Sequence, residues 1–490
     1  MFKVYKTPEF KKAVRFYLEG MKGNKKHFYI AMSSAVLWCF LVVLHPYIIK
    51  RVVDDGIVTG NTRILVILLS SLIVIGYTRA ISIGTRRYYG MSVSYNVEAG
   101  IRNNIFSHMQ KLAFKYHDKV PTGELMARAS SDASQVRLAY AIAPLASSNL
   151  FLLFILSLTL LSISLPLGSV VMLSIPAVLW VGAKFAEKAM KVSLRVKEAE
   201  ATMTTEVEEQ LGGIRVVKAF GNENIASNKV DQAIDNIYEK SLDYLDLRTR
   251  FVPIFELIPM IITLFVLVLG GFLSVNGYIT LGDFIAFNQY VFLLMWPLRI
   301  TAWFLSEIPA SVSAANRILE LLNEKPAIVN NENVEKLPEG GNGTITFNKV
   351  NFKYGNEKIF DDLSFSIDGK KTVAIVGSTG SGKSTLGYLI PRLYEINSGE
   401  IQIDGIDINN LNLSELRNNV SLAFQESFLF SNSAKENIAI GLKDATQEEI
   451  ENAANVARAH DFISELPEAY ETTVGERGYG LSGGQRQRIA

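Results

Sequence analysis

The 490-residue sequence has one cysteine and almost no net charge. Cys39 lies inside an apolar run, which excludes a disulfide framework and predicts a buried thiol. The formal net charge is +1, so nothing in the bulk charge favours nucleic acid, and we expect no nucleic-acid partner. Hydrophobic residues make up 49% of the chain and the mean hydropathy is +0.19, both high for a soluble protein of this length. The length predicts two or three domains.

Six apolar segments are almost free of charge over lengths that suit a membrane, whose hydrocarbon core of about 30 Å needs about 20 helical residues. The first, Phe28–Ile49, is followed by Lys50 and Arg51 instead of a small-residue cleavage site, so we expect it to remain as a spanning helix. The others are Ile64–Thr78, two spans within the uncharged stretch Leu138–Ala183 that break at Leu165–Gly168, Leu257–Gly282, and Phe284 to about Phe304 after a turn at Asn276-Gly277.

The loop charges predict how these segments are oriented. The first 27 residues contain eight Lys/Arg and two acidic side chains, with apolar residues at helical spacing, which indicates an amphipathic helix on the cytoplasmic surface. The long charged stretches Arg86–Arg137 and Lys184–Glu256 then lie on the same side. The sequence therefore predicts a multi-pass protein of the cell membrane with its soluble parts in the cytoplasm.

The two charged stretches are typical of helices that leave the membrane, reverse at a short connector and return. We expect the connectors at Phe114–Asp118, which precedes Val120–Gly123, and at Leu211–Phe220, where paired glycines interrupt the pattern. Such hairpins could be rigid levers that carry motion into the bilayer, or simply solvated charged faces. The pattern alone leaves both interpretations open.

A hydrophilic stretch from Asn323 to Asn342 indicates a linker to a second domain. Short strand-like runs follow it, and a buried strand is expected at Thr372–Val376 before a helix that includes Leu386–Ile390. An antiparallel β subdomain that leads into an α/β core is the natural assembly. Its first strands are expected at Thr344–Phe347, Val350–Tyr354 and Leu363–Ile367.

Between the last strand and the helix, GSTGSGKST matches the pattern G-x-x-x-x-G-K-[ST]. Glycines in this pattern let backbone N–H groups point at nucleotide phosphates. Lys383 adds a positive charge, and Ser384 offers a hydroxyl to Mg²⁺. We therefore expect a nucleotide site formed by Gly377, Ser378, Thr379, Gly380, Ser381, Gly382, Lys383, Ser384 and Thr385.

With LSGGQ about a hundred residues later, the chain resembles a half-transporter of the ATP-binding cassette (ABC) exporter type over nearly its whole length. The resemblance implies ATP and Mg²⁺ as cofactors, with Tyr354 stacking on adenine and Gln425 joining the Mg²⁺ and water shell. It also implies a dimer, because the signature would face the γ-phosphate held by the opposite subunit. That signature is Leu481, Ser482, Gly483, Gly484 and Gln485.

Other segments add to the resemblance. Thr473–Gly478 resembles the exporter loop that touches the membrane connectors, and Pro121–Leu125 with Ser131-Asp132, and Gly213–Phe220, resemble the two cytosolic turns. The implied fold is multidomain: an all-α membrane domain of six helices with long cytosolic extensions, then an α/β P-loop NTPase domain with an antiparallel β subdomain. The expected boundaries are 1–27 for the interfacial helix, 28–322, a linker at 323–342, and 343–490.

One departure from the family concerns catalysis. The sequence stops at Ala490, whereas the family continues into an acidic strand, a catalytic glutamate and a switch histidine. We therefore expect an incomplete copy, assign no catalytic residue, and expect the unpaired core to expose apolar surface.

Two functions remain open at this point. The first is ATP-driven export of a small amphipathic molecule, lipid or peptide by half of a homo- or heterodimer in the lipid bilayer. The alternative is a nucleotide-binding, non-hydrolysing regulatory half. Arg79 and Arg299 are candidate residues of a substrate cavity, although arginines at their depth also extend toward the cytoplasmic interface, and Glu256 is ambiguous in the same way.

Overall fold

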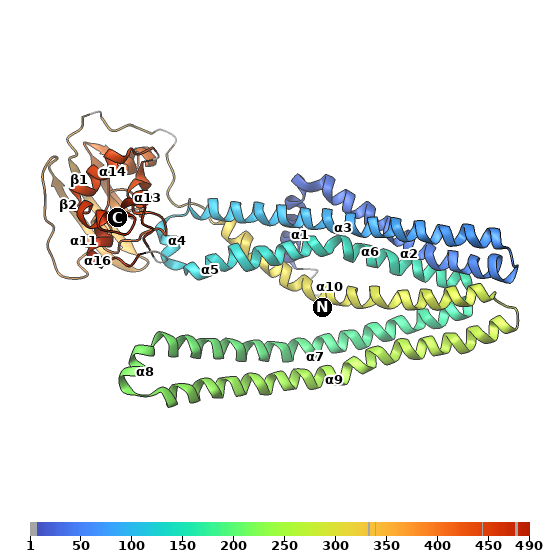
Figure 1. Ribbon diagram of the computed structural model, residues 1–490. Helices are drawn as coiled ribbons and strands as arrows, with labels where there is room; N and C mark the ends of the chain where they lie inside the picture. The colour runs from blue at the N-terminus through green and yellow to red at the C-terminus, as the bar shows by residue number, and fades with distance from the viewer. Residues whose placement is uncertain (1–6, 332–333, 339, 443, 476–478) are drawn as a thin grey trace. The chain divides into compact units, whose positions relative to one another are not determined.

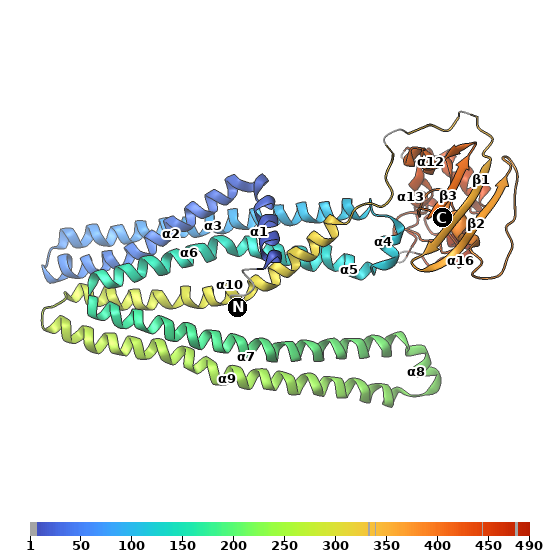
Figure 2. The same cartoon turned by 180° about the vertical axis from the view of Figure 1, so that it is seen from behind.

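The computed structural model in Figures 1 and 2 describes residues 7–331, 334–338, 340–442, 444–475 and 479–490. The side chains at 178–179, 183, 186, 255–256, 298–303 and 305–306 also lie outside the description. The chain forms two compact units. We call Met1–Lys111 with Val120–Glu324 the helical unit, and Leu112–Lys119 with Lys325–Ala490 the αβ unit.

The helical unit is built from long helices that lie side by side, with the short α1 lying crosswise to them (Figures 1 and 2). Five helical stretches are long and apolar enough to cross a membrane: Pro8–Val58, Thr62–Met109, Thr122–Ile163, Leu165–Gly212 and Glu223–Val275. The sixth predicted span lies in α10, part of which is outside the described side chains. The helices are α1 (Pro8–Gly20), α2 (Lys25–Arg51), α3 (Thr62–Met109), α5 (Thr122–Ala127), α6 (Ala133–Ile163), α7 (Leu165–Gly212), α8 (Ile214–Phe220), α9 (Glu223–Val275) and α10 (Leu281–Asn323).

Three of these helices are much longer than a bilayer is thick. The helices α3 and α7 have 48 residues and α9 has 53, which at 1.5 Å per residue is about 70–80 Å. The short connector α8 joins α7 to α9, and Phe114–Lys119 forms the short helix α4. The break predicted at Leu165–Gly168 lies one residue earlier, at Ser164, since α6 ends at Ile163 and α7 begins at Leu165. The break predicted at the paired glycines is confirmed, since α7 ends at Gly212.

The core of the helical unit lies where α2, α6, α7, α9 and α10 meet. It includes the fully buried Cys39, Leu156 and Phe287. The prediction of a buried thiol is therefore confirmed.

Prolines interrupt most of the long helices. Each removes a backbone donor and weakens the helix locally, which permits a bend. Among the described helices of more than 25 residues, only α3 has no interior proline; the interior prolines are Pro46, Pro144, Pro176, Pro253, Pro259, Pro297 and Pro309.

The αβ unit contains a four-stranded antiparallel sheet of order β2-β1-β3-β4. The predicted strands at 344–347 and 350–354 form the single strand β1, and the antiparallel subdomain is confirmed. Phe347 pairs with Phe365 across β1 and β2, and their rings stack 4.7 Å apart. The strands are β1 (Ile345–Tyr354), β2 (Glu357–Ile367), β3 (Ser398–Ile403) and β4 (Ile406–Asp407). The helices of this unit are α4 (Phe114–Lys119), α11 (Lys383–Leu389), α12 (Leu413–Asn419), α13 (Ala434–Ile438), α14 (Gln447–Val456), α15 (His460–Ser464) and α16 (Gly483–Ile489).

The prediction of a buried strand at Thr372–Val376 is wrong. The segment belongs to no strand, and Val373, Ile375 and Val376 are 51%, 47% and 88% exposed. The physical reason is that a strand needs a hydrogen-bonded neighbour, and no described segment pairs with this one. The described residues accordingly contain no parallel sheet, and the expected exposure of apolar surface is present at this segment.

Part of the predicted linker is fixed to the αβ unit. The amide of Glu335 donates to the carbonyl of Asn410 (2.7 Å), and the amide of Leu413 donates to the side chain of Asn330 (2.7 Å). These bonds hold the segment around Asn330 and Glu335 against the αβ unit.

Candidate nucleotide-binding site

The phosphate loop has the shape that its sequence predicts. It leads from Gly377 into α11, which begins at Lys383. Gly380 and Gly382 both have φ of +85°, where side chains other than glycine are strained. A Cβ on Gly382 would lie 2.7 Å from the ring of Phe360 and 2.8 Å from Ile359, so packing as well as backbone geometry requires glycine there.

Lys383 reaches back across this loop. Its Nζ donates to the carbonyls of Gly377 (3.0 Å) and Ser378 (2.7 Å). The remaining loop residues Thr379, Gly380, Ser381 and Ser384 are exposed, so their polar groups can meet a ligand. The loop therefore brings together glycine amides and one ammonium group, which can donate hydrogen bonds to a triphosphate, and an exposed serine oxygen, which can bind its Mg²⁺ ion.

Tyr354 lies at the end of β1 beside the phosphate loop. Its hydroxyl lies near the side chain of Thr385, and burial raises its pKa above the ordinary tyrosine value. Its ring packs edge-on against Phe352 and Tyr394, with centroids 4.8 and 5.1 Å apart. Tyr354 and the phosphate loop are thus brought together.

Tyr394 contacts both the Tyr354 ring and the helix α4. Its hydroxyl donates to Oδ2 of Asp118 at 2.6 Å, and its ring lies 6.1 Å from that of Phe114. Burial, followed by the Asp118 carboxylate, raises the pKa of Tyr394, so the phenol keeps its proton. The sequence reasoning placed Asp118 in a connector but missed Tyr394. The available signal was its aromatic type a few residues after α11.

Gln425 is exposed, and its neighbours lie against α11. The ring of Phe424 is 6.0 Å from that of Tyr388, and a Cβ on Gly387 would lie 3.4 Å from Leu422. This places Gln425 near the helix that follows the phosphate loop.

The signature lies on a different core of the αβ unit. Ser482 caps α16, because its Oγ accepts from the amide of Gln485 (3.2 Å) and its own amide donates to Oε1 of Gln485 (2.8 Å). Leu481 and Ile489 pack with the small helices α13 to α15, whereas α11 packs on the sheet. Gly483 and Gly484 are exposed in the first turn. Among the described residues, no hydrogen bond joins the signature to the phosphate loop.

Similar proteins share both parts of the chain. Residues 28–298 match the ABC transporter transmembrane region, and residues 360–490 match the ABC transporter family. The chain is 31% identical to the Bacillus subtilis protein YgaD, named as a multidrug export ATP-binding/permease protein, over 97% of this chain and 83% of that one.

The chain belongs to the ABC transporter family.

Two further similarities are informative. The ATP-dependent lipid A-core flippase of Desulfotalea psychrophila is 30% identical over 94% of this chain and 81% of its own length. A bacterial Atm1-family ABC exporter solved with ATP bound has the same fold, with a TM-score of 0.75, 23% identity, and coverage of 95% of this chain and 82% of that chain. This ABC exporter is a multi-pass membrane protein with an ATP-binding domain in the cytoplasm.

The candidate substrate residues of the exporter are only partly described. Arg79 is half-buried in α3, whereas the side chains of Arg299 and Glu256 lie outside the described part of the structure. The sequence reasoning missed Arg86, which it counted as the start of a cytosolic stretch. The Arg86 guanidinium lies 4.8 Å from the Trp38 ring and donates to Oγ of Ser148 at 3.2 Å.

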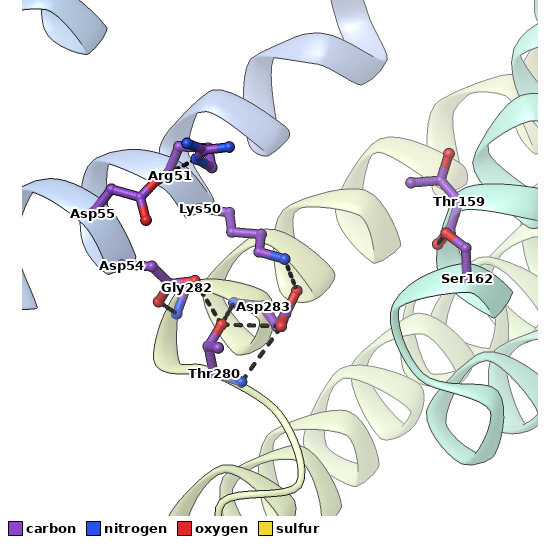
Figure 3. Close-up of polar contacts among 9 residues, drawn as sticks. All are labelled: Lys50, Arg51, Asp54, Asp55, Thr159, Ser162, Thr280, Gly282 and Asp283. Carbon is purple, nitrogen blue, oxygen red and sulfur yellow. Dashed lines mark hydrogen bonds and ion pairs between the residues drawn. The ribbon is translucent and has the colours of Figure 1, made fainter. Parts of the chain in front are cut away.

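Polar contacts also join the outer ends of two spanning helices of the exporter. Asp54, in the π-helical turn Val52–Val58 after α2, accepts from Oγ1 of Thr280 (2.6 Å) and from the amide of Gly282 (2.9 Å) at the start of α10. Lys50 forms an ion pair with Asp283 at 2.7 Å. Figure 3 shows these residues, from α2 and the turn after it and from the start of α10 with its N-cap, pointing toward one another, and we call them the outer junction.

Proposed function

We propose that the chain is one half of a dimeric exporter in which ATP drives alternating exposure of a membrane cavity to the two sides of the bilayer. The observation that carries the proposal is the contact of α4 with the nucleotide site. α4 stands in sequence between helices of the membrane domain, yet it belongs to the αβ unit and is bonded there to Tyr394.

The phosphate loop would hold the triphosphate. Lys383 already lies over the loop, so its ammonium can pass from the Gly377 and Ser378 carbonyls to phosphate oxygens. Mg²⁺, held by Ser384 and phosphate oxygens and approached by Gln425, would neutralise charge during phosphoryl transfer. Tyr354 would give its ring face to the adenine.

The signature would complete the site of the partner subunit. Exposed amides at the start of α16 suit a phosphate oxygen. Because the signature and the phosphate loop lie on separate cores of the αβ unit, a second chain is the natural source of the missing half of each site. We propose a second half-transporter as partner.

Transmission would follow a short chain of contacts. Tyr354 lies near Thr385 of the phosphate loop, its ring contacts that of Tyr394, and the Tyr394 hydroxyl donates to Asp118 in α4. ATP can shift the equilibrium between two conformations of the transporter only if it binds one of them more tightly. A direct contact between the nucleotide site and α4 would make the position of α4 depend on which conformation ATP favours.

We propose that the substrate is amphipathic. Relatives are named for multidrug export and for lipid A-core flipping, and both kinds of compound have apolar parts. The half-buried Arg79 and, by sequence position, Arg299 would contact an acidic group of such a substrate.

ATP-dependent uptake of a fluorescent amphipathic dye into inside-out proteoliposomes tests the pump. Lys383→Ala should abolish uptake, because the phosphate loop loses its positive charge. Lys371→Ala is the matched control, since Lys371 is exposed near the loop and pairs with Asp368. ATP-dependent uptake that survives in Lys383→Ala would refute the pump.

Mixed dimers test whether the sites are shared. In a dimer of one Lys383→Ala chain and one Ser482→Arg chain, both defects fall in one site and leave the other intact if each site uses both chains. Such mixtures should regain hydrolysis that neither variant shows alone. No recovery in the mixture would contradict sites shared between the chains.

A further inference from the structure

A partly open apolar cavity lies between the crosswise helix α1 and the membrane helices. Its volume is about 320 Å³. Its walls include Ala13 and Tyr17 from α1, Ala139 and Ala143 from α6, and Ile308 from α10. α1 therefore covers a space that its own side chains do not fill.

The polar groups around the cavity already have partners. The hydroxyl of Tyr17 donates to the carbonyl of Ser311 (3.2 Å), and the hydroxyl of Tyr140 donates to the carbonyl of Tyr17 (2.6 Å). The Glu307 carboxylate accepts from Gln135 at 3.2 Å. No lining side chain within the described residues has a buried polar atom that lacks a hydrogen bond. The cavity therefore suits an alkyl chain and offers nothing to a polar molecule.

The cavity lies at the inner boundary of the bilayer. Its α6 residues Leu138–Ala143 are 20 to 25 residues from Ile163, the outer end of the helix. At 1.5 Å per residue that is about 30–38 Å, which is the full depth of a hydrocarbon core of about 30 Å. α1 crosses the long helices (Figure 2) and lines the cavity together with these α6 residues. An acyl chain of the cytoplasmic leaflet is therefore the apolar group within reach.

The same region is strongly basic. Five exposed lysines on α1, in the turn after it and at the start of α2 have no acidic partner among the described residues, whereas Arg15 is paired with Glu19. Each basic residue near an anionic leaflet contributes about 1 kcal/mol to attraction. The five are Lys11, Lys12, Lys22, Lys25 and Lys26.

We propose that this cavity holds an acyl chain of an anionic phospholipid from the cytoplasmic leaflet, with the headgroup beside Lys11 and Lys12. The bound lipid fills the space beneath α1 and fastens that helix to α6 and α10. The cavity lies in the helical unit and shares no residue with the nucleotide site.

Native mass spectrometry of the intact protein tests the proposal after reconstitution with equal phosphatidylglycerol and phosphatidylcholine. Wild type should retain phosphatidylglycerol. Ala13→Leu and Ala143→Leu fill the cavity from two different helices and should each lower its binding about fivefold, which is about 1 kcal/mol. Ala141→Leu is the matched control, because Ala141 lies on α6 but does not line the cavity.

Charge is tested separately from shape. Lys11→Gln with Lys12→Gln should remove the preference for phosphatidylglycerol over phosphatidylcholine, whereas Lys188→Gln with Lys191→Gln on α7 should not. The proposal is overturned if the folded cavity-filling variants retain as much phosphatidylglycerol as Ala141→Leu does, or if wild type retains phosphatidylcholine equally well. Because a second filling variant comes from α6, misfolding of Ala13→Leu leaves the test intact.

Discussion

Two glycines of the phosphate loop separate the effect of backbone conformation from that of packing. Gly380 and Gly382 have the same φ of +85°, so a side chain costs about 1–3 kcal/mol at either position. Only at Gly382 would a Cβ also meet neighbours, 2.7 Å from Phe360, whereas nothing lies within 4 Å at Gly380.

We therefore expect Gly382→Ala to lower the melting temperature of the protein more than Gly380→Ala does, and to lose ATP binding. Differential scanning fluorimetry with and without ATP measures both effects. Equal shifts in the two variants would show that contact with Phe360 and Ile359 is unimportant.

At the scale of elements, the outer junction joins the turn after α2 to the start of α10. Asp54 bonds to the first residues of α10, while its neighbour Asp55 bonds to Arg51 of its own helical segment (Figure 3). Loss of a helix-capping carboxylate costs about 0.5–2 kcal/mol. Removal of Asp54 therefore weakens the state in which α2 and α10 touch.

Asp54→Ala should raise the outward-open population about fivefold, which corresponds to about 1 kcal/mol, and Asp55→Ala should leave it nearly unchanged. Spin-label distances between the outer ends of α2 and α10, in a Cys39→Ser background, report the populations. If both variants give the wild-type distance distribution, the junction does not control opening.

The contact between α4 and Tyr394 makes a prediction about coupling. Tyr394→Phe removes the bond to Asp118 but keeps the ring against Tyr354. We expect ATP affinity within about twofold of wild type and fewer substrate molecules moved per ATP, because the site remains and its link to the connector weakens. Parallel assays of uptake and phosphate release measure the ratio, and Tyr388→Phe is the aromatic control.

The pH dependence of this contact has a definite sign. Burial and then Asp118 raise the pKa of Tyr394 above its ordinary value of about 10. The protonated Tyr394 therefore makes its full contribution to the free energy of unfolding below about pH 10, and this contribution is lost as pH rises through the higher pKa that Tyr394 has in the folded state. In thermal unfolding, the melting temperature of wild type should fall more than that of Tyr394→Phe between about pH 10 and 11. Equal falls in the two proteins would argue against the bond between Tyr394 and Asp118.

Helices and turns that depend on local sequence pattern could be predicted, whereas contacts between residues far apart in the sequence could not. Uncharged runs predicted the spanning helices, and paired glycines predicted the break between α7 and α8. Thr372–Val376 has the composition of a strand, but strand formation also requires a neighbour, which local pattern does not contain. The bond between Asp118 and Tyr394 joins residues 276 positions apart, beyond the reach of any periodicity.

For the whole molecule, loop charge predicts which ends of the helices face outward. In a Cys39→Ser background, Asn276→Cys should react with a membrane-impermeant maleimide in intact cells. Val216→Cys, exposed on α8, should react only after the membrane is permeabilised. The reverse pattern would invert the topology, and Cys39→Ser alone is the unlabelled control.

The absence of an interior proline makes α3 different from the other long helices. The helices α2, α6, α7, α9 and α10 can each flex where a backbone hydrogen bond is missing. α3 is an unbroken rod of about 70 Å whose inner end leads into the segment that contains α4. A tilt of about 5° at one end of such a rod displaces the other by about 6 Å, roughly one helical turn. A small displacement of the inner end of α3 would thus become a larger displacement at the other side of the bilayer, while the proline-containing helices bend around the straight α3.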